Sequence, residues 1–532
     1  MRIAYADRGP APLGPAAGPV SRDSTEGRWG AFSIEKFAGA TPLRYTHEDA
    51  LGWLGYLEQF GERNFWFADD GVKTWAYEEE FDNWQDRYGM DAVLAAYHSG
   101  HGDMLGDGTF VAPMGGVWDN RSEARSTRMR LGNEKVNYVF FSTCLSLRVL
   151  GGHTPNRSWA ASNLGFRMLF GFETVSIDDP NYGAYFWQEW RKGKTLAQAW
   201  LDASWRISTA QAPSVAACGA TRQEAVDRLD RERQFSPEHV SDAWWAWRWY
   251  DPARTHREPS LRLPEHPQVV QLEPRSLDRE VQLLEEQAGL EHAGPEEVAV
   301  DRQGVLGFSA DGRTLGTGPQ ANRWIRFAAP AEAAATPVPE DEAVSAARAF
   351  TERNGYPDLV LDSVHEVREC CGTRSGEVEE PRVRETMVTF RQTFSGIPVI
   401  TPGRGEVRVS VDNDGRVVAA QVSTREVVRT TSHLTSSVPD PEPGGHGAPS
   451  RAAAPRDRRE ALAEQEDRLL ADLAVRGAEP QARPEARDVP GTEEVGYEIE
   501  GNEAYLVARK QIEVGPEDGF VTRRWVTAPL AR

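Results

Sequence analysis

Two continuous apolar runs constrain the fold of this 532-residue chain more than any other feature of its sequence. AVLAAY (92–97) and VNYVFFS (136–142) contain no charged side chain. Strands buried on both faces have such runs, because helices cover both sides of a parallel sheet. Each run is followed at once by polar and reactive residues. The sequence therefore predicts central strands of a parallel sheet that carry chemically active groups at their carboxyl ends.

The segments around these two runs alternate between strand-like and helical patterns. We expect strands at GAFSIEKF (30–37), NFWFA (64–68) and RMLFGFETVSI (167–177). Apolar residues recur at helical spacing in segments 46–60 and 196–207, which predicts amphipathic helices. Alternation of this kind is typical of a mostly parallel sheet covered by helices. The predicted fold class is α/β.

The tryptophans mark a boundary near the middle of the chain. All but two of the 17 tryptophans lie at or before Trp249, so the first half has an aromatic core of its own. The cluster WWAWRWY (244–250) is expected either to pack back on the first domain or to form its last helix. We expect these parts along the chain: a flexible N-terminal segment 1–26, an α/β domain 27–250, a linker 251–290, an α+β module 291–430, a linker with a charged helix 431–495 and a C-terminal strand pair 496–532.

The second half of the chain has a different texture. Segment 343–350 has helical periodicity, and the segments on both sides of DNDG (412–415) alternate like antiparallel strands around a turn. A charged helical stretch follows at about 456–475. EAYLVARKQIEV (503–514) and GFVTRRWVTAP (519–529) close the chain as two strands. These patterns predict a small α+β module, a linker and a final strand pair.

The composition excludes several classes of function. Lys and Arg total 60 against 81 Asp and Glu, a formal charge of −21, so the surface repels phosphate backbones and no nucleic-acid partner is expected. Four cysteines, two of them adjacent, suggest no disulfide framework and favour a reducing compartment. The N-terminus lacks a signal-peptide pattern, and no apolar run reaches 18 residues. The sequence therefore predicts a soluble cytoplasmic protein with no membrane partner.

Reactive residues follow both apolar runs. His98-Ser-Gly-His101-Gly102 comes directly after the first run, and Cys144 stands at the end of the second. Ligands and catalytic groups in open α/β sheets gather at the carboxyl ends of strands. A cysteine nucleophile needs a base to form its thiolate, and we expect His101 to serve Cys144 in this way. The N–H groups of Gly102, which lacks a Cβ, and of Cys144 are the expected oxyanion donors.

These residues resemble the paired signature of the caspase-like clan of cysteine peptidases, clan CD, which includes caspases, gingipains, legumains and separases. In that clan a hydrophobic strand ends in His-Gly, and the next hydrophobic strand ends in the nucleophilic cysteine. The resemblance covers roughly residues 27–210. It implies an α/β/α sandwich with a mostly parallel sheet, with His101 as general acid and base and Cys144 as nucleophile. GKTLAQAW (193–200) is similar to the helix that follows the cysteine in bacterial members.

Substrate preference in this clan depends on a pocket that holds the residue before the scissile bond. The chain lacks the QACRG context of caspases, and a long arginine-rich segment separates the histidine from the cysteine, so the preference is open. Asp178 and Asp179 follow the next strand and are favoured as an acidic pocket for Arg or Lys. Three other aspartates near strand ends, Asp69, Asp70 and Asp103, are expected to be solvated loop acids.

The second half resembles, more loosely, PepSY-like modules and the propeptides of thermolysin-type and fungalysin-type peptidases. FRQTFSGIPV (390–399) carries this likeness. Such modules are usually inhibitory or chaperone-like, which implies a module that packs on the peptidase or presents partners. An unrelated hairpin-rich scaffold would account for the same pattern.

The sequence thus predicts a caspase-like cysteine endopeptidase that acts on a protein or peptide substrate, without cofactor or metal, and is regulated by its second half. A catalytically inactive scaffold that binds a protein partner is the alternative. A third hypothesis is a metal-dependent hydrolase that uses His98 and His101, for which no third or fourth ligand is evident. Arginine-rich segments near 222–233 and 451–459 are candidate self-cleavage sites.

Overall fold

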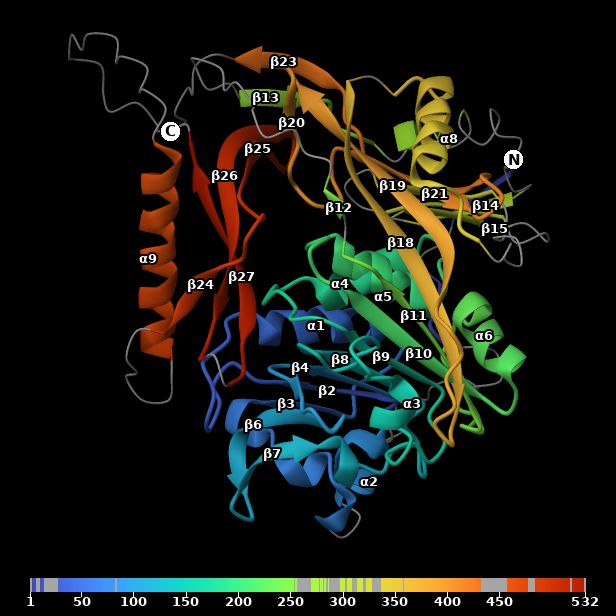
Figure 1. Ribbon diagram of the computed structural model, residues 1–532, viewed down its shortest axis with the longest axis vertical. Coiled ribbons are helices and arrows are strands. Elements are labelled where there is room, and N and C mark those ends of the chain that lie inside the picture. The colour runs from blue at the N-terminus through green and yellow to red at the C-terminus, as the bar shows by residue number, and fades with distance from the viewer. Residues whose placement is uncertain are drawn as a thin grey trace.

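Strands from both halves of the described chain form one continuous sheet of 18 strands (Figure 1). The computed structural model describes residues 2–5, 10–13, 27–81, 84–252, 254–255, 269–276, 278–280, 282–283, 286, 297–301, 304–308, 313–318, 322–327, 336–356, 358–431, 457–476, 484–516 and 519–530. Parts of the predicted N-terminal segment and linkers, including the candidate cleavage residues 451–456, lie outside the described residues.

The parallel part of this sheet lies in the first half of the chain. Its strands follow one another in the spatial order β3 (Phe65–Ala68), β2 (Trp29–Ser33), β4 (Ala95–Ser99), β8 (Tyr138–Ser142) and β9 (Met168–Phe172). All four pairings are parallel, as the two apolar runs predict. The first run becomes a strand only at Ala95 and continues beyond Tyr97, so His98 and Ser99 belong to the strand.

Antiparallel strands extend the sheet beyond β9. In spatial order they are β10 (Pro213–Gly219), β11 (Trp244–Tyr250), β18 (Leu359–Thr373), β19 (Arg382–Phe394), β21 (Glu406–Asp412), β22 (Val417–Val422), β17 (Arg323–Arg326), β16 (Thr314–Thr317), β15 (Gly304–Phe308) and β14 (Glu297–Asp301). Strand β1 (Arg2–Tyr5) pairs with β14 in parallel, and the short strands β12 (Arg254–Thr255) and β20 (Ile397–Pro398) pair with β18 and β19. The described fold is therefore mixed α/β, and parallel pairing is a minority of the whole sheet.

The aromatic cluster WWAWRWY forms strand β11, so the prediction of a last helix is wrong. Trp245, Trp247 and Trp249 face one core of the first domain, whereas Ala246 and Tyr250 face the other. A strand places alternate side chains on opposite faces, and this period of two fits a sheet that is buried on both sides. The cluster does pack on the first domain, as predicted, and it joins that domain to β18.

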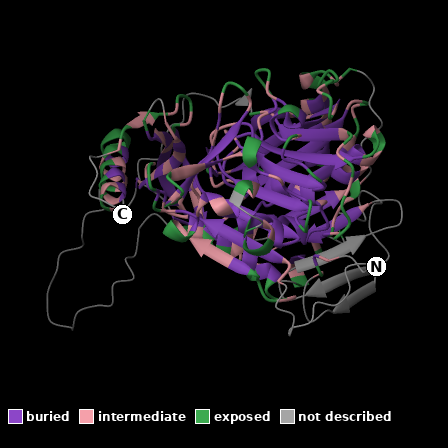
Figure 2. Cartoon of the chain, turned by 90° about the horizontal axis from the view of Figure 1, so that it is seen from below, coloured by how far each residue is buried: buried purple, intermediate pink, exposed green. Residues whose placement is uncertain are grey.

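Helices cover one face of the parallel strands. Helices α1 (Thr46–Leu57), α4 (Tyr182–Trp190), α5 (Leu196–Trp205) and α6 (Arg222–Arg231) pack there over a core rich in Trp and Phe. The other face is covered by short elements: α2 (Trp84–Tyr88), α3 (Pro155–Ser158), the 3-10 helices η2 (Asp69–Gly71), η3 (Thr74–Ala76), η4 (Glu79–Phe81), η5 (Met90–Ala92) and η6 (Ser126–Arg128), and strands β5 (Asp103–Met104), β6 (Phe110–Trp118) and β7 (Arg121–Arg125). Most strands that Figure 2 colours by burial are therefore purple, that is, buried.

The module in the second half contains the predicted helix and hairpin. Helix α8 (Glu340–Arg353) packs on β19, β21 and β22, with Ala343, Ala347 and Phe350 in the shared core. DNDG forms the turn between β21 and β22, where the Gly415 N–H donates to the Asp412 carbonyl at 3.0 Å. Gly415 has φ +78°, which suits glycine.

A second sheet of six described strands contains the C-terminal strand pair. β26 (Glu503–Val514) and β27 (Thr522–Pro529) pair antiparallel, as predicted. The other strands are β13 (Val269–Leu272), β23 (Val427–Thr431), β24 (Ala486–Asp488) and β25 (Glu494–Glu500). Helix α9 (Arg458–Arg476) packs on β26 and β27 at the outer side of this sheet (Figure 1). Within the described ranges, no helix has the length and apolar character needed to cross a bilayer.

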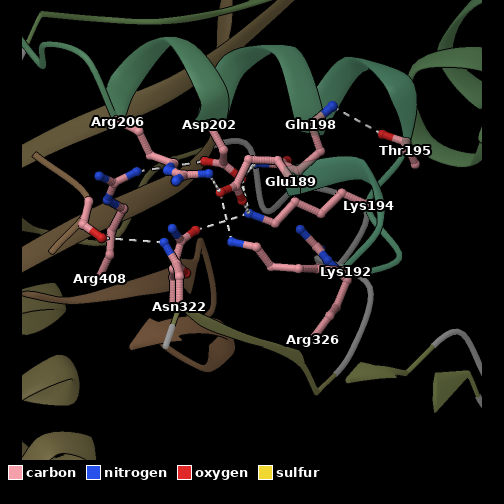
Figure 3. A network of polar contacts seen from close by, with 12 residues as sticks. Glu189, Lys192, Lys194, Thr195, Gln198, Asp202, Arg206, Asn322, Arg326 and Arg408 are labelled. Carbon is pink, nitrogen blue, oxygen red and sulfur yellow. Dashed lines mark hydrogen bonds and ion pairs between the residues drawn. The ribbon is translucent and has the colours of Figure 1, made fainter. Parts of the chain in front are cut away.

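A buried network of charges joins the first domain to the module (Figure 3). Lys194, between α4 and α5, lies 2.5 Å from Glu189 and 2.6 Å from Asp202. Its Nζ also donates to the Gln421 side chain of β22 at 2.9 Å. The further cations on Glu189 are Lys192, at 2.7 Å, and Arg206, at 3.0 Å. From the module, Arg408 of β21 lies 3.7 Å from Asp202. Because these charges are removed from water, each depends on its partners in the network.

Candidate active site

His101 and Cys144 follow two neighbouring parallel strands. Ser99 at the end of β4 pairs with Ser142 at the end of β8, and each candidate residue comes two positions later. The two loops touch, since a Cβ added to Gly102 would lie 2.8 Å from the Cys144 carbonyl oxygen. Position 102 therefore needs glycine for this close approach. The structure brings the predicted His-Gly pair and the predicted cysteine together at one edge of the sheet.

The His101 ring is fully buried and is held by one hydrogen bond. Its Nε2 lies 2.8 Å from the Thr41 carbonyl oxygen, which only accepts, so Nε2 carries the ring proton. Nδ1 has no partner within the described structure and keeps a free lone pair. Burial lowers the pKa of His101 to about 4, although the Thr41 hydrogen bond opposes this change. At neutral pH the ring is thus uncharged, in the tautomer that leaves Nδ1 able to accept a proton.

The Cys144 thiol is 2% exposed and lies among polar groups. The Ser176 N–H donates to its Sγ at 3.3 Å, and the Ser176 Oγ lies 3.5 Å away. The thiol donates in turn to the Val521 carbonyl oxygen at 3.3 Å, and no hydrogen bond joins it to His101 in the part of the chain described. Burial raises the pKa of Cys144, and the Ser176 contacts oppose that rise. In this arrangement the thiol stays protonated at neutral pH.

The backbone turns sharply at the cysteine. Leu145 has φ +54°, a left-handed conformation that few residues other than glycine adopt. Its N–H donates to the Thr174 carbonyl at 3.1 Å, which helps to hold the turn. The N–H groups of Gly102 and Cys144 have no acceptor among the described residues. Strained backbone and unsatisfied buried donors of this kind gather at functional sites.

Asp178 and Asp179 have different surroundings. The Asp178 carboxylate accepts from the N–H groups of residues 44–45 at 2.9 and 3.3 Å, and the Arg524 guanidinium lies 2.5 Å from it. Asp179 accepts from the N–H and the side-chain amide of Asn181, at 2.9 and 2.8 Å, directly before α4. Burial raises the pKa of Asp179 to about 6. Asp178 therefore already forms an ion pair with an arginine of this chain, whereas Asp179 stabilises a turn.

A small enclosed cavity lies between the strand ends, with a volume of about 10 Å³, which is room for roughly one water molecule. The polar residues that line it include Asp49, Ser99, Ser142, Asp178, Asp179 and Thr522. Asp49 was not predicted from the sequence. Its carboxylate accepts from the hydroxyls of Tyr97 and Ser99 at 2.8 Å each, and burial raises its pKa to about 6.

A helical pattern could have revealed Asp49. It lies four residues before Trp53 and eight before Leu57, on the apolar face of α1. An acid on the buried face of a helix needs partners, and such acids are candidates for functional sites.

His98 has a structural environment distinct from that of His101. Its Nδ1 lies 2.7 Å from the Tyr77 hydroxyl within the core, and burial lowers its pKa to about 3. In the residues that the structure describes, no group of three or more His, Cys, Asp or Glu side chains is arranged to bind a metal ion. The structure thus offers the metal-hydrolase hypothesis no ligand set in those residues.

The remaining residues singled out in the sequence lie in ordinary surroundings. Asp69 accepts from the N–H groups of residues 35–36 at 2.9 and 3.0 Å, Asp70 is exposed, and Asp103 accepts from the next N–H at 2.7 Å. Asp69 and Asp70 begin the 3-10 helix η2, and Asp103 begins strand β5. The other three cysteines are free and buried: Cys218, Cys370 and Cys371.

A comparison with protein families matches the first half of the chain. The matching model is described as a domain of unknown function (DUF6345) and covers residues 31–249. This span begins within β2 and ends within β11, so it includes the parallel strands and the loops of His101 and Cys144. A search of curated proteins gives no match.

Proposed function

We propose that this protein is a caspase-like cysteine endopeptidase in which Cys144 is the nucleophile and His101 the general acid and base. The main observation in support is the contact between the Gly102 backbone and the Cys144 carbonyl at the ends of the paired strands β4 and β8. The same two loops carry His101, an uncharged imidazole with a free Nδ1, and Cys144, which precedes the strained turn at Leu145. These are the two parts that thiol catalysis requires.

The proposed reaction follows from this geometry. Cys144 leaves its contact with Val521, transfers its proton to Nδ1 of His101 and forms a bond from Sγ to the substrate carbonyl carbon. The oxyanion accepts from the N–H groups of Gly102 and Cys144. The C–N bond then breaks, Nδ1 returns its proton to the leaving amine, and an acyl thioester is left. Water, deprotonated by His101, hydrolyses that thioester and restores the thiol.

The finer features of the fold belong to the same proposal. Five parallel strands with helices on one face and shorter elements on the other support an α/β/α sandwich of the caspase-like type. Continuation of the sheet into β18 and β19 supports a module that regulates the first domain. Four free cysteines support a reducing, cytoplasmic compartment.

A specific observation favours the alternative, an inactive scaffold that binds a protein partner. The Cys144 thiol contacts Val521 rather than His101, and burial raises its pKa. A thiol that never leaves this state would have no role in catalysis. The two functions therefore differ in whether His101 accelerates Cys144 once the thiol is uncovered.

Alkylation with iodoacetamide between pH 6 and 9, read by mass spectrometry on each cysteine, separates the two functions. Arg524→Glu puts a like charge against Asp178 and should therefore free the segment that contacts Cys144 through Val521. The wild type and Arg524→Glu are each compared with and without His101→Gln, which keeps an N–H donor for Thr41. We expect Cys144 of Arg524→Glu to react at least about tenfold faster than Cys218 near neutral pH and to slow when His101 is replaced. If Cys144 of Arg524→Glu reacts faster than in the wild type but at the same rate with and without His101, the peptidase is refuted and the scaffold is left.

A further inference from the structure

The segment Phe520–Arg524, which we call the C-terminal arm, includes the first three residues of β27 and crosses the candidate active site. The Val521 carbonyl lies 3.3 Å from the Cys144 Sγ. The ring of Phe520 lies 6.1 Å, centroid to centroid, from the ring of His101. The arm therefore lies against both candidate catalytic side chains, whose exposures are 2% for Cys144 and 0% for His101, and Phe37 lies on the His101 ring as well, at 4.8 Å between centroids.

The arm lies on the site as an extended peptide does. The Arg523 N–H donates to the Ser176 carbonyl at 3.1 Å, and the Arg523 carbonyl accepts from the Asp178 N–H at 2.9 Å. The two segments thus pair in parallel, with Arg523 opposite Ile177. Backbone pairing of this kind is how many proteins bind extended peptide segments.

One buried ion pair fixes the far end of the arm. Arg524 lies 2.5 Å from Asp178, and the side chains are only 3% and 2% exposed. Thr522, between this pair and the thiol contact, closes the small cavity that Asp49 and Asp179 also line. The arm therefore presents a basic side chain to a site whose buried lining is acidic.

We propose that the C-terminal arm is an internal pseudosubstrate, and that the site it fills takes extended peptides bearing an arginine for Asp178. When the arm leaves, Asp178 loses its counter-charge, and a substrate arginine restores the pair. An acidic peptide would instead meet Asp178, Asp179 and Asp49. The regulatory part of this proposal rests on the proposed peptidase function, because a covered nucleophile is inhibited only if it is a nucleophile.

Charge reversal of Arg524 tests whether the arm covers the site. Arg524→Glu faces Asp178 with a like charge, so the arm should detach and expose Cys144. We expect iodoacetamide to alkylate Cys144 at least about tenfold faster than in the wild type, with Cys218 unchanged. If Arg524→Glu does not fold, Arg524→Gln, which removes the charge and keeps donors, should give a smaller rise in the same direction.

Lys510→Glu is the matched control. This substitution makes the same change of charge on the neighbouring strand β26. Lys510 pairs with Glu466 and Asp488, which contact neither Cys144 nor His101. It should leave the Cys144 rate as in the wild type. The proposal is overturned if Arg524→Glu folds with an unchanged Cys144 rate. It is also overturned if Cys218 rises together with Cys144, or if Lys510→Glu has the same effect.

Peptide competition tests the ligand class. A synthetic amide of the arm sequence extended by Trp525, Phe-Val-Thr-Arg-Arg-Trp, added to Arg524→Glu should protect Cys144 from alkylation. The same peptide with glutamate in place of its second arginine should not. Equal protection by both peptides, or protection by neither, would refute a site for basic peptides.

Hydrolysis separates this inference from the proposed function. In Arg524→Glu, cleavage of arginine-containing peptides that is lost in Cys144→Ala would support both. Faster alkylation and peptide protection without any cleavage would refute the peptidase, whereas the assignment of the arm as a basic-peptide mimic would stand.

Discussion

His101 and Asp49 lie at one edge of the sheet, and burial shifts their pKa values in opposite directions. It lowers the pKa of His101 to about 4 and raises that of Asp49 to about 6. Both shifts favour the uncharged form, because burial penalises charge. Between pH 4 and 6, proton uptake by His101 therefore opposes folding, whereas proton uptake by Asp49 favours it. Only a comparison of variants separates the two residues.

We predict that His101→Gln reduces the acid sensitivity of the protein. An unfolded histidine titrates near its usual pKa of about 6.5, so the unfolded state takes up this proton first as the pH falls. The contribution of neutral His101 is complete above about pH 6.5 and is lost as the pH falls toward 4, by about 2 kcal/mol at pH 5. Between pH 7 and 5, the free energy of unfolding in urea should fall by that much more in the wild type than in the variant. Parallel pH profiles would contradict this prediction.

Gly102→Ala should destabilise the protein and displace the two loops. The added Cβ would meet the Cys144 carbonyl at 2.8 Å and Thr143 Oγ1 at 2.9 Å, so backbone must shift. We expect a loss of about 1–3 kcal/mol in the free energy of unfolding, the usual cost of overpacking. Gly106→Ala is the control, because an added Cβ there meets nothing within 4 Å. Equal stabilities of the two variants would show that the approach of Gly102 is not close in solution.

At the scale of elements, the sequence indicates strands by their pattern but does not indicate their distant partners. The two apolar runs predict β4 and β8. Strands that follow one another along the chain are usually neighbours in a sheet, so the loops of His101 and Cys144 are expected to meet. The alternative of a helix for WWAWRWY is wrong because its tryptophans at 245, 247 and 249 recur at every second residue, which is the period of a strand. The contact of Val521 with Cys144 joins residues 377 positions apart, and no local pattern marks it.

The seam between β11 and β18 depends on Glu369, which receives three arginines. Arg248 lies 2.5 Å away, and Arg382 and Arg384 lie at 2.7 and 3.2 Å. Burial alone would raise the pKa of Glu369, but these cations lower it to about 2. A carboxylate with a lowered pKa contributes stability above the unfolded pKa, and this contribution is lost as the pH falls through the folded pKa.

Glu369→Gln should therefore destabilise the chain at neutral pH. We expect a loss of about 3 kcal/mol in the free energy of unfolding at pH 7, and a smaller difference from the wild type as the pH falls from 4.5 toward 2. Glu379→Gln, between β18 and β19, is the control, since the side chains of its ion pair with Arg222 are 40% and 34% exposed and should contribute less than about 1 kcal/mol. Urea denaturation at several pH values measures both variants. A difference that persists undiminished at pH 2 would contradict the assigned cause.

At the scale of the whole molecule, the candidate site belongs to both halves of the chain. The first half supplies His101 and Cys144, and the second supplies the C-terminal arm that covers them. The shared sheet and the network around Lys194 hold the halves together (Figure 3). Uncovering the site therefore requires the first residues of β27 to separate from β26, but it does not require the two halves to separate.

Lys194→Met tests this view of the molecule. Methionine fills much of the same space without a charge, so Asp202 keeps only the Arg408 cation at 3.7 Å, and Glu189 keeps Lys192 and Arg206. Removal of one partner from such a buried network should lower the free energy of unfolding by about 3 kcal/mol, whereas Lys135→Met, at an exposed position, should change it by less than about 0.5 kcal/mol. Because β11 and β18 still pair, alkylation of Cys144 and of Cys370 should begin at the same urea concentration in the variant, as in the wild type. If Cys370 reacts at a lower urea concentration than Cys144 in Lys194→Met but not in the wild type, the two halves of the variant unfold independently. The network rather than the shared sheet would then join the halves.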